Sequence, residues 1–174
     1  MEYYKGQNIN LRPLETEDLN VLYDWENNPD IWTVSNTITP YSKHVLLRYI
    51  ESAGTDIYSS KQLRLVIEKK DQNKAIGFID LFDFDPYNSK VGIGILIAET
   101  KERNKGFAAE ALQLMLEYVS KHLGLKQAYC NVTIDNKNSM RLFEKAGFTK
   151  SGIKKDWVRV QDTWLDEALY QLIF

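Results

Sequence analysis

The segment from residue 91 to residue 121 places an apolar strand pattern almost directly before a long helical pattern. The run "VGIGILIA" (91–98) is rich in Val and Ile, which favours a buried β-strand. Residues 105–121 then carry apolar side chains at helical spacing: Ala108, Leu112, Met115, Leu116 and Val119. A strand that leads through a short loop into an amphipathic helix restricts the chain to folds in which helices pack on a sheet. The sequence therefore predicts a mixed α/β fold.

The rest of the chain contains similar strand and helix signals. We expect further strands at 9–14, 63–70, 75–82, 126–133, 150–160 and 163–173, and further helices at 17–28, 41–54 and 137–146. Residues 31–41 are rich in Thr and are expected to be irregular. The order is β-α-α-β-β-β-α-β-α-β-β on one central sheet. With 174 residues and no linker or internal repeat, the chain is expected to form a single domain over 1–174.

Charge and cysteine content exclude several classes of protein. A net charge of −2 argues against a general nucleic-acid binder. No apolar run approaches the roughly 20 residues that a membrane helix needs. The lone Cys130 cannot form an intramolecular disulfide, and "MEYYKGQNIN" lacks the apolar core of a signal peptide. We therefore expect a cytoplasmic protein without a nucleic-acid or membrane partner.

The junction between strand 91–98 and the following helix has the composition of an anion site. Gly92 and Gly94 interrupt the strand, and glycine there marks a bulge or a close approach by backbone or ligand. Lys101, Arg103 and Lys105 precede a helix N-terminus that is already positive. Basic loops with free helical N–H groups bind phosphates. Neither a P-loop nor a dinucleotide fingerprint is present, so the spacing favours an anion site, with a solvated basic turn as the alternative.

Two motifs extend this interpretation. Arg103-x-x-Gly106-x-Ala108 resembles the pyrophosphate-binding motif Arg/Gln-x-x-Gly-x-Gly/Ala of the GNAT N-acetyltransferase superfamily, and "NKNSMRLFEKAGF" (136–148) resembles its next block. The stretches "INLRPLETEDL", "WENNPDIW", "IGFIDLFDFDP" and "WLDEALYQLIF" resemble the spermidine/diamine and ribosomal-protein branch. The resemblance implies a mixed, mostly antiparallel sheet of about seven strands flanked by about four helices.

The resemblance also implies acetyl-CoA as cosubstrate and no metal. Its implied contacts are the backbone of Leu96, Ile97 and Ala98 with the pantetheine arm, the loop residues Arg103, Asn104, Lys105, Gly106, Phe107 and Ala108 with the pyrophosphate, and Asn136 and Ser139 with the cofactor from the next helix. Asn104 stands where many relatives have glycine. Because Asn tolerates left-handed backbone, we expect the loop to keep its shape. Relatives often assemble, so a homo-oligomer is possible.

Acetyl transfer to an amine needs no covalent enzyme intermediate, so Cys130 is expected to be a core or strand residue. The amine must first lose a proton, because an alkylamine has a pKa near ~10.4. Many polyamine-type relatives have a tyrosine, thought to protonate the leaving thiolate, where this chain has Phe143. That role cannot be transferred, which leaves the catalytic residues unknown. Tyr129 or Tyr170 could replace the tyrosine, or both could be packed strand aromatics.

Acidic residues suggest where a cationic acceptor binds. Asp80 and Asp83, with Glu26 near the first helix, are predicted to attract an amine. Asp24, Asp30 and Asp85 lie in the same two segments. The alternative is that these acids serve turns or face solvent.

Aromatic and histidine residues complete the candidate set. Trp25 and Trp32 either form an apolar or cation–π wall beside those acids or pack in the core. His44 and His122 stand alone without ligand spacing, so no metal site is expected.

These features predict an N-acetyltransferase that moves an acetyl group from acetyl-CoA to a primary amine by direct attack. The favoured acceptor is a polyamine or diamine such as spermidine. Two alternatives remain: acetylation of the N-terminus of a ribosomal protein, and a CoA- or polyamine-binding module without turnover, which Phe143 suggests.

Overall fold

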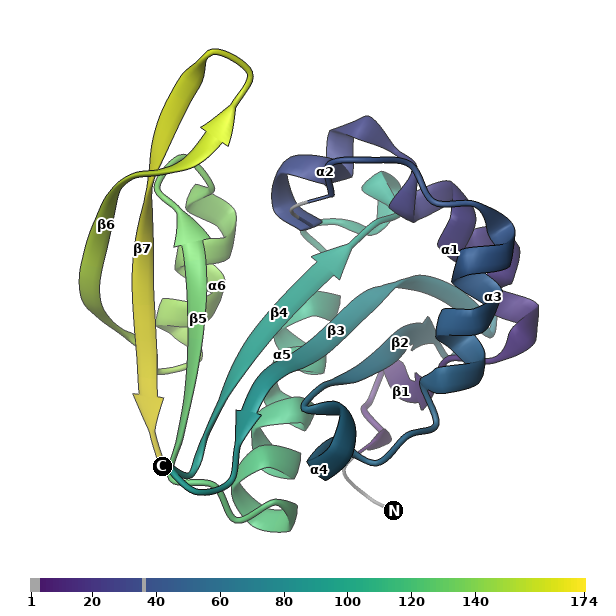
Figure 1. Ribbon diagram of the computed structural model, residues 1–174. Helices are drawn as coiled ribbons and strands as arrows, with labels where there is room; N and C mark the ends of the chain where they lie inside the picture. The colour runs from purple at the N-terminus through teal and green to yellow at the C-terminus, as the bar shows by residue number, and fades with distance from the viewer. Residues whose placement is uncertain (1–3, 36) are drawn as a thin grey trace.

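A seven-stranded sheet forms the centre of the computed structural model, which describes residues 4–35 and 37–174. Its strands are β1 (Ile9–Pro13), β2 (Leu63–Lys69), β3 (Lys74–Asp85), β4 (Lys90–Ile97), β5 (Gln127–Thr133), β6 (Thr149–Val160) and β7 (Thr163–Ile173). They lie in the order β1-β2-β3-β4-β5-β7-β6 (Figure 1). Every neighbouring pair is antiparallel except β4 and β5.

Six α-helices occur within the described residues. They are α1 (Leu19–Glu26), α2 (Pro29–Ser35), α3 (Lys43–Ser52), α4 (Ile57–Ser60), α5 (Phe107–Glu117) and α6 (Lys137–Lys145). Short 3₁₀ segments η2 (Thr16–Asp18) and η3 (Thr100–Glu102) precede α1 and α5, and a π turn η4 (Tyr118–His122) continues α5. None of the described helices is long and apolar enough to cross a membrane.

Helices cover both faces of the sheet because alternate strand residues point to opposite sides. On β2, Val66 belongs to the cluster formed with Leu22 of α1 and Leu46 of α3. The adjacent Ile67 belongs to the larger cluster that includes Leu112 of α5. Figure 1 shows α5 and α6 behind the sheet and α1 and α3 on its other side. The part of the sheet around β2 is therefore buried between two layers of helices, whereas most residues of β6 are exposed.

Strands β4 and β5 are neighbours over only three residue pairs. The parallel pairs are Lys90↔Gln127, Val91↔Ala128 and Gly92↔Tyr129. Beyond them, β4 continues to pair with β3 and β5 continues to pair with β7. Figure 1 shows the two strands side by side near the C-terminus and diverging toward their other ends. The divergence separates β1–β4 from β5–β7 and positions the candidate site.

The fold class predicted from the sequence is confirmed, and the structure adds two short helices to the expected four. Residues 31–41 were expected to be irregular, yet α2 covers Pro29–Ser35. Proline is favoured at the first position of a helix, where its missing N–H costs nothing. The side-chain oxygen of Asn28 accepts a hydrogen bond from the backbone N–H of Asp30 at 3.0 Å. Asp56 similarly accepts from the backbone of Tyr58 and Ser59 and begins α4.

Candidate active site

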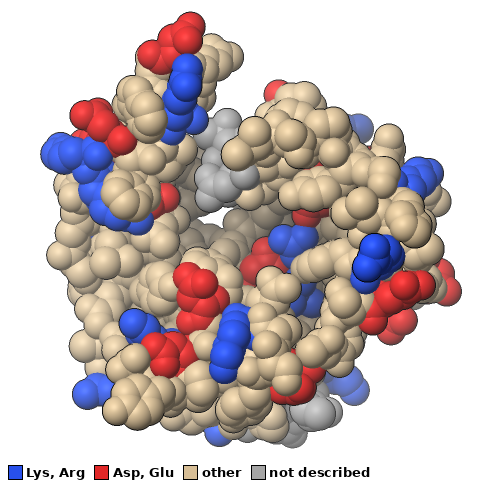
Figure 2. Space-filling view, viewed as in Figure 1, with Lys and Arg blue, Asp and Glu red and all other residues tan. Residues whose placement is uncertain are grey.

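A cavity of about 710 Å³ fills the space where β4 and β5 diverge. Residues 93–96 of β4 form its floor. One wall comes from α1, α2, α3, β2 and β3, and the other from β5, α6 and the β6–β7 hairpin. Figure 2 shows the molecule hollowed between that hairpin and the helical half. The cavity is large enough for part of a cofactor and a small acceptor together.

The floor of the cavity is one edge of β4. Beyond Gly92, β4 pairs with β3 alone among the described strands, so alternate N–H and C=O groups face the cavity. A Cβ atom on Gly92 would lie 2.2 Å from the Phe82 ring, so this glycine is required by packing. A Cβ atom on Gly94 would make only ordinary contacts, at 3.8 Å to Phe82 and 3.9 Å to Asp80. Gly94 therefore leaves room in the cavity rather than relieving a clash.

The loop between β4 and α5 uses left-handed backbone at two positions. Asn104 has φ 61° and Gly106 has φ 88°, which confirms the expectation that Asn104 can take the place of glycine. Gly106 is the N-cap of α5, and no side chain of the described residues caps this helix. A Cβ atom on Gly106 would meet nothing within 4 Å. The first-turn N–H groups of α5 are thus accessible to an anion.

Acidic partners compensate part of the positive charge of this loop. Lys105 Nζ lies 3.1 Å from a carboxylate oxygen of Glu102, and Lys69 lies 3.5 Å from the same oxygen. Lys105 holds the pKa of Glu102 below its usual range. Arg103 Nε donates a hydrogen bond to the carbonyl oxygen of Ile97 at 2.8 Å.

The cofactor residues predicted from the resemblance do not all lie at the cavity. Leu96, Asn136 and Ser139 line it. Within the protein, the N–H of Ala98 donates a hydrogen bond to the carbonyl of Ile76 at 3.0 Å, and the carbonyl of Ile97 accepts one from Arg103. The register that joins Ala98 to Ile76 also pairs Leu96 with Phe78, so the backbone of Leu96 faces β3 as well, and the N–H of Ile97 is the one among these three that faces away from β3.

At the start of α6, two of these residues also shape the helix. Asn136 Oδ1 accepts a hydrogen bond from the backbone N–H of Ser139 at 3.1 Å and so caps α6. Phe143 lines the cavity one helical turn later but is 3% exposed and packs edge-on against Phe148.

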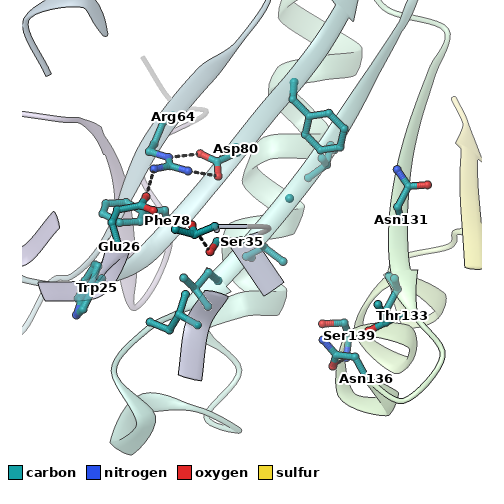
Figure 3. Close-up of a pocket in the computed structure, with 18 of the residues that line it drawn as sticks. Trp25, Glu26, Ser35, Arg64, Phe78, Asp80, Asn131, Thr133, Asn136 and Ser139 are labelled. Carbon is teal, nitrogen blue, oxygen red and sulfur yellow. Dashed lines mark hydrogen bonds and ion pairs between the residues drawn. The ribbon is translucent and has the colours of Figure 1, made fainter. Parts of the chain in front are cut away.

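An ion-pair network that the sequence did not reveal lies on the opposite wall. Arg64 of β2 donates to Asp80 of β3 from Nε at 2.7 Å and from Nη2 at 2.9 Å, and to Glu26 of α1 from Nη1 at 2.6 Å (Figure 3). The guanidinium carbon lies 5.1 Å from the ring centroid of Phe78 and 5.7 Å from that of Tyr49. Glu26 and Asp80 thus reach the cavity as predicted, but both carboxylates are bound to a cation.

Asp83 and Asp85 lie elsewhere. Asp83 accepts a hydrogen bond from the hydroxyl of Tyr129 at 3.0 Å and is not one of the described residues that line the cavity. Burial and this carboxylate raise the pKa of Tyr129 to about 12. Asp85 accepts from the backbone of Asn88 at 2.9 Å and so closes the β3–β4 turn. The turn role considered for these acids matches the position of Asp85, whereas Asp83 is an exposed residue within β3, where the register with β4 shifts.

The remaining acids and the tryptophans near α1 occupy different environments. Asp24 and Asp30 are exposed and are not among the described lining residues. Trp25 lines the cavity but is 8% exposed and packs edge-on against Phe78 at 5.0 Å. Trp32 Nε1 donates to the carbonyl of Glu26 at 2.8 Å, which ties α2 to the end of α1.

The alternative nucleophile and proton donors are buried in the sheet. Cys130 is 1% exposed, and burial raises the pKa of its thiol. Tyr170 is fully buried and donates its hydroxyl to Glu144 at 2.8 Å, and burial together with Glu144 raises the pKa of Tyr170 to about 12. Neither these two nor Tyr129 is among the described lining residues. In the part of the chain that the structure describes, no group of three or more His, Cys, Asp or Glu could hold a metal ion.

The wall formed by β5, β6 and β7 carries a balanced pair of charges. Lys154 pairs with Glu167 and donates to Asn131 Oδ1 at 3.1 Å. The register of β6 shifts between Lys154 and Val158, and Trp157 inside this bulge also lines the cavity. Lys154 Nζ lies 4.9 Å from the centroid of the Trp157 ring. The two walls therefore differ, since only the one with Arg64, Glu26 and Asp80 carries a net negative charge.

Comparison with known proteins agrees with this arrangement. Residues 8–149 match the acetyltransferase (GNAT) domain family. The chain is 28% identical over 144 residues to the spermidine N(1)-acetyltransferase of Vibrio cholerae, covering 83% of this chain and 80% of that protein. It is 26% identical over 174 residues to the uncharacterized N-acetyltransferase p20 of Bacillus licheniformis, covering 99% and 97%.

A solved structure shares the fold. The crystal structure of spermidine N-acetyltransferase from Vibrio cholerae in complex with CoA and spermine superimposes with a TM-score of 0.86 at 23% identity, covering 95% of each chain. The family match spans most of the chain and includes the divergent strands, the loop after β4 and α6. The chain therefore belongs to the GNAT acetyltransferase family and is an acetyl-CoA-dependent N-acetyltransferase.

Proposed function

We propose that this protein acetylates a primary amine of a polyamine or diamine such as spermidine. The observation that carries the proposal is the cavity on the free edge of β4, with Glu26 and Asp80 on one wall. A polyamine has a second ammonium group that such carboxylates attract. The similarity to spermidine N(1)-acetyltransferases supports the same acceptor class.

The residues of the β4–α5 loop suit the pyrophosphate of acetyl-CoA. The open first turn of α5 offers N–H groups and a positive dipole, and the space beside Gly106 allows close approach of an anion. Arg103 through Ala108 would hold the phosphates. Leu96, Asn136 and Ser139 would contact the pantetheine arm inside the cavity.

The floor of the cavity suits the reacting end of the acceptor. Ile93, Ile95 and Leu96 make this region apolar, and an apolar environment lowers the pKa of an amine from near ~10.4 and so favours the neutral nucleophile. A backbone N–H on the free edge of β4 would stabilise the negative charge that develops on the thioester oxygen. The remaining ammonium of the acceptor would lie against Glu26 and Asp80.

Thiolate departure proceeds in this proposal without a tyrosine. Phe143 cannot donate a proton, and the hydroxyls of Tyr129 and Tyr170 are directed to Asp83 and Glu144. A thiol with a pKa near ~8.5 leaves as a thiolate at modest cost. The amine proton passes to water or to a base within the cavity.

An acceptor screen tests this function. Purified protein is mixed with acetyl-CoA and either spermidine, a monoamine or a peptide with a free N-terminus, and the release of CoA thiol is followed. We expect the highest kcat/KM with spermidine. Faster turnover of the peptide would instead favour N-terminal acetylation, and CoA binding without thiol release for any amine would contradict turnover by this chain.

A further inference from the structure

The network around Arg64 has a function beyond holding the fold together. We propose that Arg64 is a positioning residue for the acceptor, which holds Glu26 and Asp80 in place at the cavity to receive an ammonium group. This inference rests on the proposed acceptor class.

The geometry of the network is well suited to that role. Arg64 binds Asp80 through two nitrogens and Glu26 through a third, and the planar guanidinium fork fixes carboxylates more firmly than a point charge does. Each residue comes from a different element, β2, β3 or α1, and all three line the cavity. The orientation of both carboxylates therefore depends on one side chain.

The charges of the network add up to a cation-binding wall. Burial acts to lower the pKa of Arg64, but Asp80 and Glu26 outweigh it and raise that pKa, so Arg64 stays a cation. Two carboxylates and one guanidinium leave one net negative charge. Among the described residues, the titratable Tyr49 of α3 also lies against the guanidinium, and Lys154 and Glu167 on the opposite wall neutralise each other.

Without Arg64 the two carboxylates would lose the cation they share. Neither side chain would then be held by the hydrogen bonds that direct it in the native protein, and each would be free to turn away from the cavity. The acceptor KM would rise, because binding of an ammonium would also have to order both side chains.

Arg12 offers a matched control. It binds Asp18 at 2.7 Å and Glu68 at 2.6 Å, so it also bridges a strand to the N-terminal helical segment through two carboxylates. Its side chain is 27% exposed, close to the 23% of Arg64. Arg12 is not one of the described residues that line the cavity. A purely structural role predicts that substitutions of the two arginines behave alike.

The test compares Arg64→Met, Arg64→Lys and Arg12→Met in steady-state kinetics with spermidine. Loss of the fixed carboxylates should raise the spermidine KM of Arg64→Met by about tenfold or more. The kcat and the KM for acetyl-CoA should change little. Arg64→Lys should lie between, because it restores the charge but not the fork. Arg12→Met should lose stability but keep the native KM.

The outcomes separate the two proposals. A wild-type protein that does not acetylate spermidine overturns the proposed acceptor. Normal wild-type turnover with an Arg64→Lys or Arg64→Met protein whose spermidine KM matches that of Arg12→Met overturns only the role of Arg64. If Arg64→Met does not fold, Arg64→Lys decides the question by the same comparison.

Discussion

Arg103 Nε donates a hydrogen bond to the carbonyl oxygen of Ile97 and thereby ties the basic loop to the last residue of β4. The bond uses one of the five guanidinium N–H donors, and the others remain for a further acceptor. The loop is thus held in place before any anion arrives, and pre-organisation of this kind reduces the entropic cost of binding.

Gly106 provides the first prediction. Gly106→Ala should weaken binding of CoA by about tenfold or more, because it strains left-handed backbone and puts a methyl group where the phosphates would approach. Gly124 has φ 63° and is equally open, so Gly124→Ala is the matched control. Calorimetric titration should show native affinity for the control, although both variants lose about 1 kcal/mol of stability. Equal CoA affinities for Gly106→Ala and Gly124→Ala would show that the phosphates bind elsewhere.

The unusual Phe143 provides the second. Phe143→Tyr should change kcat by less than roughly tenfold, or about 1.4 kcal/mol of barrier, if the thiolate leaves without a proton donor. Single-turnover measurement of thiol release checks this. A much larger gain would show that the native chain lacks a needed acid.

Substitutions of Asp80 and Asp83 are predicted to have different effects, although the two residues are only three positions apart on β3. Asp80→Asn should raise the spermidine KM more than the KM of a monoamine, and high salt should reduce the difference, because exposed charges are screened beyond about 8–10 Å. Asp83→Asn should leave both values near native, since that carboxylate is bound to Tyr129. A larger rise in the spermidine KM for Asp83→Asn than for Asp80→Asn would instead place Asp83 in the acceptor site.

The two tyrosines excluded as proton donors can be tested together. Tyr170→Phe should lower the free energy of unfolding by about 1 kcal/mol through loss of its hydrogen bond to Glu144. Tyr129→Phe should behave similarly. Both should keep kcat within about threefold of native, or roughly 0.7 kcal/mol of barrier. A large drop in kcat with native stability would identify a proton donor.

Acid stability should depend on Asp18. Burial acts to raise the pKa of Asp18, but the hydrogen bonds from Arg12 and from the backbone of Glu15 outweigh it and lower that pKa from 3.8. A lowered pKa stabilises the fold above the unfolded value and loses this contribution as the pH falls through the folded value. Asp18→Asn should therefore cost roughly 1.5–3 kcal/mol at pH 7 and progressively less below about pH 4.

Denaturant titrations across that range check the prediction. Asp71 serves as the control because its pair with Lys69 is 3.6 Å long and its side chain is 64% exposed. Asp71→Asn should cost no more than about 0.5 kcal/mol at any pH. A loss of unfolding free energy in Asp18→Asn that does not depend on pH would contradict the lowered pKa of Asp18.

Local patterns were sufficient to predict most strands and helices, but they failed where one signal has two meanings. An Asn-Pro pair such as Asn28-Pro29 is typical of a helix end, and α1 does end at Glu26. The same pair also begins α2, since Asn28 caps and Pro29 occupies the first position. Ile31 then packs into the cluster with Trp25. Burial of Ile31 in the tertiary structure therefore favours a helix in a segment whose composition alone suggested a loop.

The site could be predicted only where its chemistry is local. The loop motif lies within six consecutive residues, 103–108, so its left-handed backbone could be predicted from the sequence. The structure has this backbone at Asn104 and Gly106. Arg64 lies 38 residues from Glu26 and 16 from Asp80, so nothing near it in the sequence indicates its partners. The internal partner of the Ala98 N–H depends in the same way on the distant Ile76.

The short ladder between β4 and β5 also affects how water reaches the backbone. Successive N–H groups of residues 93–96 point alternately toward β3 and toward the cavity. Neighbouring amides on one continuous strand should therefore exchange with deuterium at sharply different rates, protected and open in turn. A bound molecule that accepts hydrogen bonds from the N–H groups facing the cavity would slow their exchange as well. All the amides of this stretch would then be protected, like those of a strand inside a sheet.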